Sequence, residues 1–591
     1  MTPDKPDKPD LDAGACLHIS TTWVAAFNGA LAHPEVATLD ALFLSDCHLR
    51  SVLAFSWTLE TYSGTSAVCE ALRHISDDHK LGVITLNAQD LQPHCVQRAG
   101  EWTVECLLTF STPVGPCEGV LRLCSDGSGQ WKAWSLVLAL IEIAGHEEAY
   151  KRPQDASASN NRSFQGPNWK DKRDARNRFE DREPEVLVVG AGQAGLSVGA
   201  RLRQLGVDAL VVDQNARLGD NWRNRYHALV LHNQRHVNHL PYMPFPETWP
   251  TYIPKDKLAD WFAYYADAMD LAVWMGTRFV NADYDAADKR WCVTLETPTG
   301  EKTVRPAHII MATGVSAIPN RKKLPELQPF EGPVIHSADY QTPDPEKFGS
   351  VVVMGTGTSA HDVAQDLAEN GVKVTMVQRS PTMVQNVEPT AQLPYAIYGK
   401  ALSTDVCDLL TVGTPMALYK ASSRLSLKVA EELDKPLIEG LKKTDFKVNV
   451  GEDGVSWQLM YLTRGGGYYF NVGCSDLIIN GQVRVVQSDQ ITSFEASGLT
   501  LASGEHIHAD LVITATGYLG QREMAARLLG DALAERIGPV WDVNADTQEL
   551  NNMWMETPQP GLWFFAGSLA QSRIYSKYLG LQIQAKLLGL M

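Results

Sequence analysis

The sequence predicts an α/β protein built around two parallel sheets, with a smaller α+β domain in front of them. Two glycine-rich turns, at residues 190–195 and 355–360, each stand between an apolar strand and a helix. Helical patterns followed by long strand-like runs occupy residues 12–148. A single glycine turn is a weak signal, because an ordinary flexible loop can contain one. Two strand–turn–helix–strand units in one chain are a far more specific pattern.

The first unit covers residues 186–213. Its apolar strand, Val-Leu-Val-Val, is followed by Gly190, Gly192 and Gly195 at the Gly-x-Gly-x-x-Gly spacing. In this pattern the first glycine makes a tight turn, the second lets a pyrophosphate approach, and the third packs the helix on the strand. The next strand ends in Asp213, whose carboxylate can accept hydrogen bonds from ribose hydroxyls. We therefore predict a Rossmann-type nucleotide site with the phosphates at the helix N-terminus.

Length, charge and cysteine spacing limit the choice of function. A chain of 591 residues needs several domains, and a net charge of −17 argues against nucleic acid or an anionic membrane as partner. The start is a proline- and charge-rich tail, residues 1–11, unlike a signal peptide, and no run of 18 apolar residues exists to span a membrane. Seven of ten cysteines lie between Cys16 and Cys124 at irregular spacings. We expect reduced thiols in a cytoplasmic protein.

The N-terminal domain, residues 12–148, places its helices before its long strands. This order resembles the cone-shaped fold of the nuclear-transport-factor superfamily, whose members enclose a small pocket or dimerise through the open sheet face. We expect a structural module and treat this domain as the candidate surface for a homodimer. Residues 149–184 are polar and charged, and are predicted to be a linker.

The second unit, residues 351–380, repeats the pattern with Gly355, Gly357 and an alanine in the tolerated third position. Its second strand ends in Arg379 and Ser380 rather than in an acidic residue. A guanidinium and a hydroxyl bind a 2′-phosphate, whereas a carboxylate repels it. The second site is therefore predicted to hold NADPH in preference to NADH; the alternative for Arg379 is a plain surface charge.

Together, two nucleotide units predict a two-domain flavoprotein that binds FAD and NADPH, with the NADPH domain inserted in the FAD domain. After the linker, the predicted FAD domain begins with residues 185–335. The NADPH domain with a helical insertion follows at residues 336–474, and residues 475–591 are predicted to complete the FAD domain.

A segment shortly after the first unit resembles a known family. Gly219, Trp222, Arg225 and Tyr226 follow the Gly-x-x-Trp-x-x-Arg-Tyr pattern of the class B flavoprotein monooxygenases, which include flavin-containing monooxygenases and YUCCA-type enzymes. The chain also resembles fungal members of this family that carry an extra N-terminal cone domain. The resemblance covers roughly residues 185–591 and, more loosely, the first 150 residues. It implies that His232 or Asn233 lies near the reactive edge of the flavin; the alternative is a solvated or buried structural residue.

A second family motif helps to distinguish between the reactions that different members of the family catalyse. Residues 330–340 fit Phe-x-Gly-x-x-x-His-x-x-x-Tyr, with His336 at the histidine position. Baeyer–Villiger members resemble this motif but usually end in Trp, so Tyr340 favours heteroatom or YUCCA-like oxygenation. The resemblance implies that His336 connects NADP binding to domain geometry. Asn471 stands where the family often has Asp.

The resemblance also implies the reaction. NADPH reduces the flavin, O₂ adds to give a flavin hydroperoxide, and one oxygen atom enters a small organic substrate by heteroatom oxygenation or oxidative decarboxylation. The alternative is Baeyer–Villiger oxygenation of a ketone or aldehyde. No metal is needed. A disulfide reductase of similar architecture would need a redox-active cysteine pair, and no cysteine lies between Cys124 and Cys292. A non-enzymatic binding protein is the remaining alternative.

The candidate catalytic residues are His232, Asn233 and His336. The candidate cofactor-binding residues are Gly190, Gly192, Gln193, Ala194, Gly195, Asp213, Gln214, Asp220, Asn221, Trp222, Arg225, Gly314, Gly355, Gly357, Thr358, Ser359, Ala360, Arg379, Ser380, Thr516, Gly517, Tyr518 and Gly567.

Overall fold

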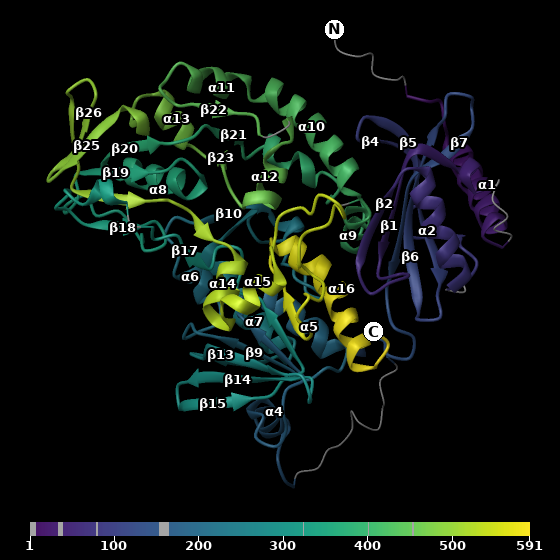
Figure 1. The fold of residues 1–591 in the computed structure, drawn as a ribbon. Helices are drawn as coiled ribbons and strands as arrows, with labels where there is room; N and C mark the ends of the chain where they lie inside the picture. Colours follow the sequence, from purple (N-terminus) through teal and green to yellow (C-terminus); the bar gives the residue numbers. More distant parts are fainter. Residues whose placement is uncertain are drawn as a thin grey trace.

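The computed structural model describes residues 8–32, 39–78, 81–152, 165–322, 324–399, 401–451 and 454–591. Most of the predicted tail, residues 1–7, and the polar stretch of the predicted linker, residues 153–164, lie outside the described residues. Figure 1 shows the N-terminal sheet on one side of the molecule and the two parallel sheets on the other.

The N-terminal domain is a mixed sheet with two helices on one face. The strand order is β2-β1-β7-β6-β5-β3, and β4 pairs with β5. On the helical face, Trp23 and Phe27 of α1 pack against Phe43 at the start of β1, with Trp23 and Phe27 stacked at 4.7 Å. The element bounds are α1 Ala13–Ala32, β1 Phe43–Val52, β2 Leu59–Ser63, α2 Thr65–Asp78, β3 Thr85–Leu86, β4 His94–Arg98, β5 Glu101–Ser111, β6 Pro116–Ser125 and β7 Trp131–Leu140.

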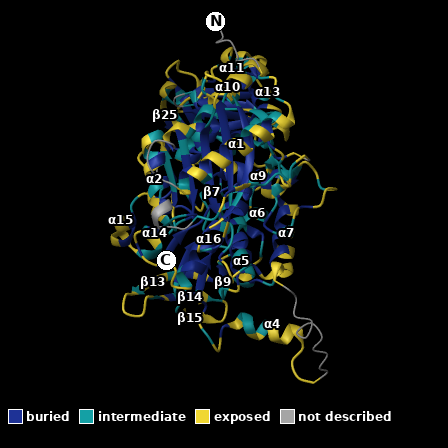
Figure 2. Ribbon diagram, turned by 90° about the vertical axis from the view of Figure 1, so that its right-hand side faces the viewer, coloured by how far each residue is buried: buried dark blue, intermediate teal, exposed yellow. Residues whose placement is uncertain are grey.

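The first parallel sheet has the order β12-β9-β8-β16-β30 and is built on buried aliphatic strands. Helix α5 contacts β8 and β9 of this sheet, and α16 packs against α5. Helix α16 is buried along most of its length, whereas α4 lies at the periphery (Figure 2). The bounds are α4 Trp169–Arg178, β8 Val186–Val189, α5 Gln193–Gln204, β9 Ala209–Asp213, α6 Asp220–Arg223, α7 Lys255–Ala268, β12 Ala272–Met275, β16 His308–Met311, α14 Gln521–Leu529, α15 Asp531–Ile537, β30 Leu562–Phe564 and α16 Leu569–Leu587.

The second parallel sheet has the order β18-β28-β19-β20-β24. Its helices α8 and α13 lie in contact, and β25, β26 and β27 form a small antiparallel sheet. The bounds are β18 Val334–His336, β19 Ser350–Met354, α8 Thr358–Glu369, β20 Lys373–Gln378, α13 Cys474–Ile479, β24 Val483–Gln487, β25 Ile491–Glu495, β26 Gly498–Leu501, β27 His506–His508 and β28 Leu511–Thr514.

This strand order corrects one predicted boundary. The sequence pattern assigns residues 475–591 to the FAD domain, but β24 and β28 belong to the second sheet. β28 pairs in parallel with β19, with Leu511 opposite Val351. The apolar runs that end at Gly314 and Gly517 have the same local pattern, so only long-range pairing decides which sheet each one joins. The chain returns to the first sheet with β30.

Short strands and a helical insertion surround the two sheets. The short strands form an antiparallel sheet (β13, β14, β15), two two-stranded ladders (β10 with β11, β17 with β29) and a parallel sheet (β22, β21, β23). The bounds are β10 Val230–Gln234, β11 Tyr252–Pro254, β13 Arg278–Asp285, β14 Arg290–Thr297, β15 Gly300–Val304, β17 Ile318–Pro319, β21 Thr382–Asn386, η5 Thr390–Tyr395, α9 Thr404–Val412, α10 Met416–Leu433, α11 Lys435–Lys442, β22 Val448–Asn449, α12 Trp457–Arg464, β23 Tyr468–Asn471 and β29 Tyr518–Leu519.

The second face of the N-terminal sheet packs on the rest of the chain through α9, as Figure 1 shows. Arg122 on β6 donates hydrogen bonds to the carbonyls of Gly413 and Leu410 at the C-terminal end of α9. Arg50 on β1 pairs with Glu549 through two bonds of 2.9 and 2.6 Å, and both side chains are buried. The open sheet face is therefore covered by the chain itself.

Candidate functional site

The first glycine turn is closed by backbone packing. Gly190 has a φ of +112°, and a Cβ there would lie 2.5 Å from the carbonyl oxygen of Ala312. A Cβ at Gly195 would lie 1.8 Å from the carbonyl oxygen of Gly190. Both positions therefore accept only glycine. Gly192 is the N-cap of α5, and a Cβ there would meet the side-chain amide of Asn221 at 3.1 Å.

Two helix N-termini meet at this turn. Gln193, in the first turn of α5, donates through Nε2 to the carbonyl oxygen of Gly567 at 3.3 Å. Gly567 directly precedes α16, whose N-cap Ser568 forms a capping box with Gln571. Ala194 is buried behind the turn. Two helices that point their N-termini at one place favour a negatively charged group there.

The acidic candidates after the first glycine turn, one at the end of β9 and one at the start of α6, already have partners within the protein. Asp213 ends β9 and accepts hydrogen bonds from the backbone N–H of Ala191 and of Asn215, both at 2.8 Å. Asp220 is buried and binds Arg217 and Arg223, so it fixes the loop that carries its neighbours. Gln214 is exposed and Arg225 is partly exposed.

The surroundings of the turn fit a bound flavin nucleotide. The indole Nε1 of Trp222 and the hydroxyl of Thr313 are buried without a hydrogen-bond partner. A Cβ at Gly314, whose φ is +82°, would meet nothing within 4 Å. Buried polar atoms normally have partners, so unpaired ones beside an open glycine turn indicate a ligand site.

The second glycine turn has the same form with more room. Gly355 has a φ of +128°, and a Cβ there would lie 2.7 Å from the carbonyl oxygen of Ala515. A Cβ at Gly357, the N-cap of α8, would meet nothing within 4 Å. Thr358 donates to the carbonyl oxygen of Tyr468 at 3.0 Å, Ser359 is partly exposed and Ala360 is fully buried. The space above Gly357 fits a second pyrophosphate.

Beyond the second turn, Arg379 and Ser380 are exposed at the C-terminal end of β20. Within the described residues Arg379 has no ion-pair partner. Its guanidinium is therefore available to a phosphate.

Two tyrosines from segments outside α8 donate hydrogen bonds to aspartates of this helix. The hydroxyl of Tyr226, which follows the Trp222 segment, donates to the carboxylate of Asp362. Tyr340 donates to Asp366 at 2.8 Å, one helical turn further along α8. Burial raises the pKa of both carboxyls, and burial together with Asp362 raises the pKa of Tyr226 well above its usual value. Neither tyrosine–aspartate pair was predicted from the sequence, although the i,i+4 spacing of the two aspartates was a usable signal.

His232 and Asn233 lie on β10 beside a cluster of aromatic side chains. The ring of His232 meets Phe470 edge-on at 6.0 Å, and Asn233 donates to the hydroxyl of Tyr395 at 3.3 Å. Trp457 lies 4.9 Å from Phe470 and 6.1 Å from Tyr395. We call Tyr395, Trp457, Tyr468 and Phe470 the aromatic wall. Burial raises the pKa of Tyr395 to about 12, so its hydroxyl is protonated at neutral pH.

His336 lies where the chain crosses between the two sheets. It is buried at the end of β18, and Tyr518 meets its ring edge-on at 5.7 Å. The adjoining ladder pairs β17 with β29, and the Thr516 hydroxyl donates to the Asn320 carbonyl oxygen at 2.8 Å beside Gly517. Burial and the nearby Arg321 lower the pKa of His336, which favours the neutral imidazole. His336, at the end of β18, and His232, on β10, lie on different elements and have different neighbours.

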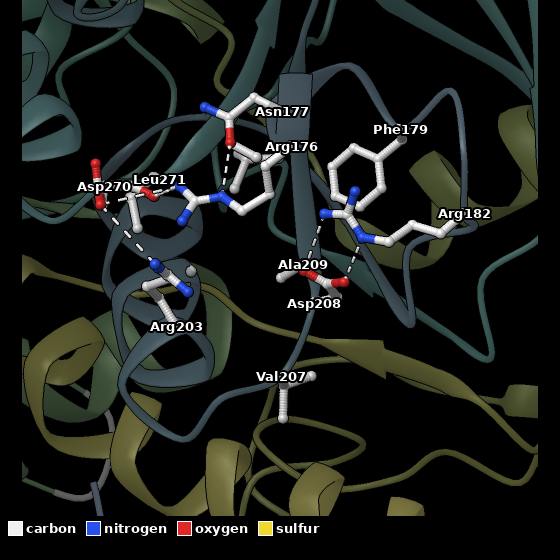
Figure 3. A pocket seen from close by; sticks show the side chains of 13 residues that line it. Arg176, Asn177, Phe179, Arg182, Arg203, Val207, Asp208, Ala209, Asp270 and Leu271 are labelled. Atoms are coloured by element: carbon white, nitrogen blue, oxygen red, sulfur yellow. Dashed lines mark hydrogen bonds and ion pairs between the residues drawn. The ribbon is translucent and has the colours of Figure 1, made fainter. Parts of the chain in front are cut away.

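A separate small pocket lies at the N-terminal ends of the strands β9 and β12 (Figure 3). It is formed where α4 meets the start of β9, and its cavity of about 20 Å³ has room for about one water molecule. Arg182 pairs with Asp208, and Arg203 and Arg176 approach Asp270. The two glycine turns follow the C-terminal ends of their strands, whereas this pocket lies at the N-terminal ends of β9 and β12, so it is separate from the candidate nucleotide sites.

The fold and the two glycine turns define a flavoprotein with two nucleotide sites, and the comparisons with known proteins agree. Residues 187–397 match the family model described as pyridine nucleotide-disulphide oxidoreductase. The chain is 31% identical over 360 residues to indole-3-pyruvate monooxygenase YUCCA1 of Oryza sativa subsp. japonica, covering 59% of this chain and 80% of that protein.

Two solved structures are also similar. A flavin-containing monooxygenase from Stenotrophomonas maltophilia matches with 20% identity and a TM-score of 0.45, over 68% of this chain and 99% of that one. A cyclohexanone monooxygenase bound to ε-caprolactone matches with 18% identity and a TM-score of 0.49, over 69% of this chain and 88% of that one.

On the sequence match, the chain belongs to the class B flavoprotein monooxygenases, the family that includes the YUCCA proteins. It is an FAD- and NADPH-dependent monooxygenase, as the sequence analysis predicted. Among the described residues no helix combines the length and the apolar composition that crossing a membrane requires. All ten cysteines are free thiols.

Proposed function

We propose that this enzyme oxygenates a small aromatic substrate, and that oxidative decarboxylation of an aromatic 2-oxo acid is its first candidate reaction. The observation that carries the proposal is the aromatic wall beside His232 and Asn233. Flat apolar rings on one side and a polar amide and imidazole on the other suit an aromatic ring that carries a polar group. The Oryza sativa relative is named for indole-3-pyruvate, an aromatic 2-oxo acid with this chemistry.

Bound flavin and nicotinamide would supply the redox chemistry, and the residues of this chain would hold and shield them. We propose that the first turn, with Gly192 and the N-termini of α5 and α16, holds the FAD pyrophosphate. The second turn, with Gly357, Thr358 and Arg379, would hold NADPH. Tyr226 and Tyr340 would fix α8 relative to the flavin, and Asn233 would orient the substrate through its contact with Tyr395.

Baeyer–Villiger oxygenation of a ketone is the second candidate, because His336 stands in a motif that resembles the one in that subgroup. A matched pair of substrates separates the two reactions. Phenylpyruvate would give phenylacetate and CO₂, whereas phenylacetone, with a methyl group in place of the carboxylate, would give benzyl acetate. Methyl phenyl sulfide tests heteroatom oxygenation. Each assay contains catalase, because free peroxide decarboxylates 2-oxo acids without an enzyme.

The expected result is phenylacetate that carries one ¹⁸O atom from ¹⁸O₂, formed with NADPH consumption that phenylpyruvate accelerates. Benzyl acetate as the main product would replace the first candidate by the second. NADPH oxidation that yields only peroxide with all three compounds would contradict the proposed substrate class.

His232 and Asn233 are distinguished by single substitutions. We expect Asn233→Ala to lower kcat for the preferred substrate by roughly 10- to 100-fold, with an unchanged KM for NADPH, because it removes a positioned polar contact. His232→Ala should then have the smaller effect. The reverse order would assign the role to His232.

The cytoplasmic location and a homodimer through the N-terminal domain also remain proposals. Free thiols support the first. The second would need a surface other than the sheet face that α9 covers, or would have to displace α9.

A further inference from the structure

A cavity outside both glycine turns lies between helices α10 and α11 and strands β21 and β22. Its volume is about 310 Å³. Its wall is mainly apolar and includes Met383, Leu427, Ala430 and Ile438. A cavity of this size accepts a small organic molecule.

One buried polar side chain in the wall has no partner. Gln385 on β21 lines the cavity and is only 4% exposed. Its Oε1 is buried without a hydrogen bond, and its amide bonds to none of the described residues. An unpaired buried amide is costly, and a bound molecule with a hydrogen-bonding group would remove that cost.

The other polar groups of the cavity indicate that this molecule is neutral. The carboxylate of Asp434 is already occupied by the side chains of Asn386 and Thr390, both at 2.7 Å. Glu431 and Lys442 are exposed at the rim and have opposite charges. The two rim charges balance each other, and burial raises the pKa of Asp434, which disfavours its charged form, so the lining selects neither an anion nor a cation.

We propose that this cavity binds a small, neutral, largely apolar molecule whose O–H or N–H group hydrogen-bonds to Gln385. The site is separate from the two nucleotide turns, since none of their residues lines it. The proposal does not depend on which substrate the enzyme oxygenates.

A pair of probes tests the proposal on the enzyme loaded with FAD, first without NADP⁺ and then with NADP⁺ at saturation. By calorimetric titration, 2-naphthol should bind roughly fivefold to tenfold more tightly than 2-methoxynaphthalene, because only the former can donate a hydrogen bond. In Gln385→Leu the two probes should bind equally. In Ala430→Leu, which fills the cavity, both should weaken by roughly tenfold. Val429→Leu, at an exposed position next to Ala430, is the matched control and should bind as the wild type does.

Three results would overturn the proposal: no binding of 2-naphthol to the wild type, binding that is unchanged in both Gln385→Leu and Ala430→Leu, or binding that saturating NADP⁺ abolishes. The last result would assign the cavity to the nucleotide site. FAD content and melting temperature establish that each variant is folded, and because the two variants test different features, failure of one to fold leaves the other decisive.

Discussion

At the residue scale, the exposed guanidinium of Arg379 makes cofactor choice testable. Arg379→Ala should raise the KM for NADPH by about 10- to 100-fold, which is the loss expected for a charge-assisted contact with a phosphate. The KM for NADH should change little. Steady-state kinetics with both nucleotides measures this, and Lys373→Ala, exposed at the other end of β20, is the control. An equal effect on both nucleotides would refute the 2′-phosphate assignment.

Two glycines in equivalent turns should respond differently to alanine. Gly195→Ala places a Cβ 1.8 Å from a backbone oxygen, so it should destabilise the fold and lower FAD content. Gly357→Ala meets nothing within 4 Å and should leave the melting temperature unchanged.

Even so, Gly357→Ala should raise the KM for NADPH by roughly tenfold or more, since its methyl group occupies the place proposed for the pyrophosphate. Melting curves and NADPH kinetics of both variants check the contrast. Normal NADPH kinetics in a folded Gly357→Ala variant would argue against a pyrophosphate above α8.

At the scale of elements, helix α8 combines functional and structural contacts. Its Asp362 and Asp366 bind tyrosines from two other segments, and its His361 stacks on Tyr469 of β23 at 3.9 Å. Burial lowers the pKa of His361 to about 4, well below the value near 6.5 expected in the unfolded chain. The neutral imidazole is thus the form that the fold accommodates.

This shift predicts a pH dependence of stability. A depressed histidine pKa stabilises the fold fully above pH 6.5, and this contribution is lost as the pH falls towards 4, because the unfolded chain binds the proton first. At pH 5 the loss due to His361 should be about 2 kcal/mol. His361→Phe, which keeps a flat ring against Tyr469, should reduce the decrease in unfolding free energy between pH 7 and pH 5 by about this amount.

Denaturant unfolding at the two pH values measures the effect, with His506→Gln at an exposed position as the control. An identical decrease in His361→Phe and the wild type would show that His361 does not carry this pH dependence.

At the scale of the whole molecule, buried ion pairs join the N-terminal domain to the oxygenase domains. Arg50 on β1 pairs with Glu549, which lies 499 residues further along the chain. Arg50 also donates a hydrogen bond to the carbonyl oxygen of Val412. Removing one partner leaves the other charge buried and unpaired, which typically costs 3–5 kcal/mol.

Arg50→Ala should therefore lower the melting temperature and expose the joint between the N-terminal domain and the oxygenase domains to proteolysis. Arg73→Ala removes a more exposed pair with Asp40 inside the same domain and should have little effect. Mass spectrometry of the first proteolytic fragments shows whether cleavage occurs between the N-terminal domain and the oxygenase domains. Equal protease resistance of both variants would show that the Arg50 pair does not hold the domain in place.

Much of the fold could be predicted from local sequence patterns. In the N-terminal domain the strands β1 and β2 lie between α1 and α2, so the predicted order of helices before long strands is wrong there. The strand Val186–Val189 and the glycine turn that follows it match the structure. These features depend on apolar periodicity, glycine positions and turns, which act over a few residues. The place of β28 could not be predicted in this way, because its apolar run fits either sheet and only its pairing with β19 decides.

By itself, the sequence determined the two glycine turns and their neighbouring strands, since these follow from residue types at fixed short spacings. Its resemblance to a known family indicated the class of enzyme. Only the tertiary structure decided that Tyr226 meets Asp362, that aromatic residues from three elements gather beside Asn233, and that Arg50 reaches Glu549. These contacts join residues far apart in the chain. Their partners are selected by the packing of whole elements, which no short stretch of sequence specifies.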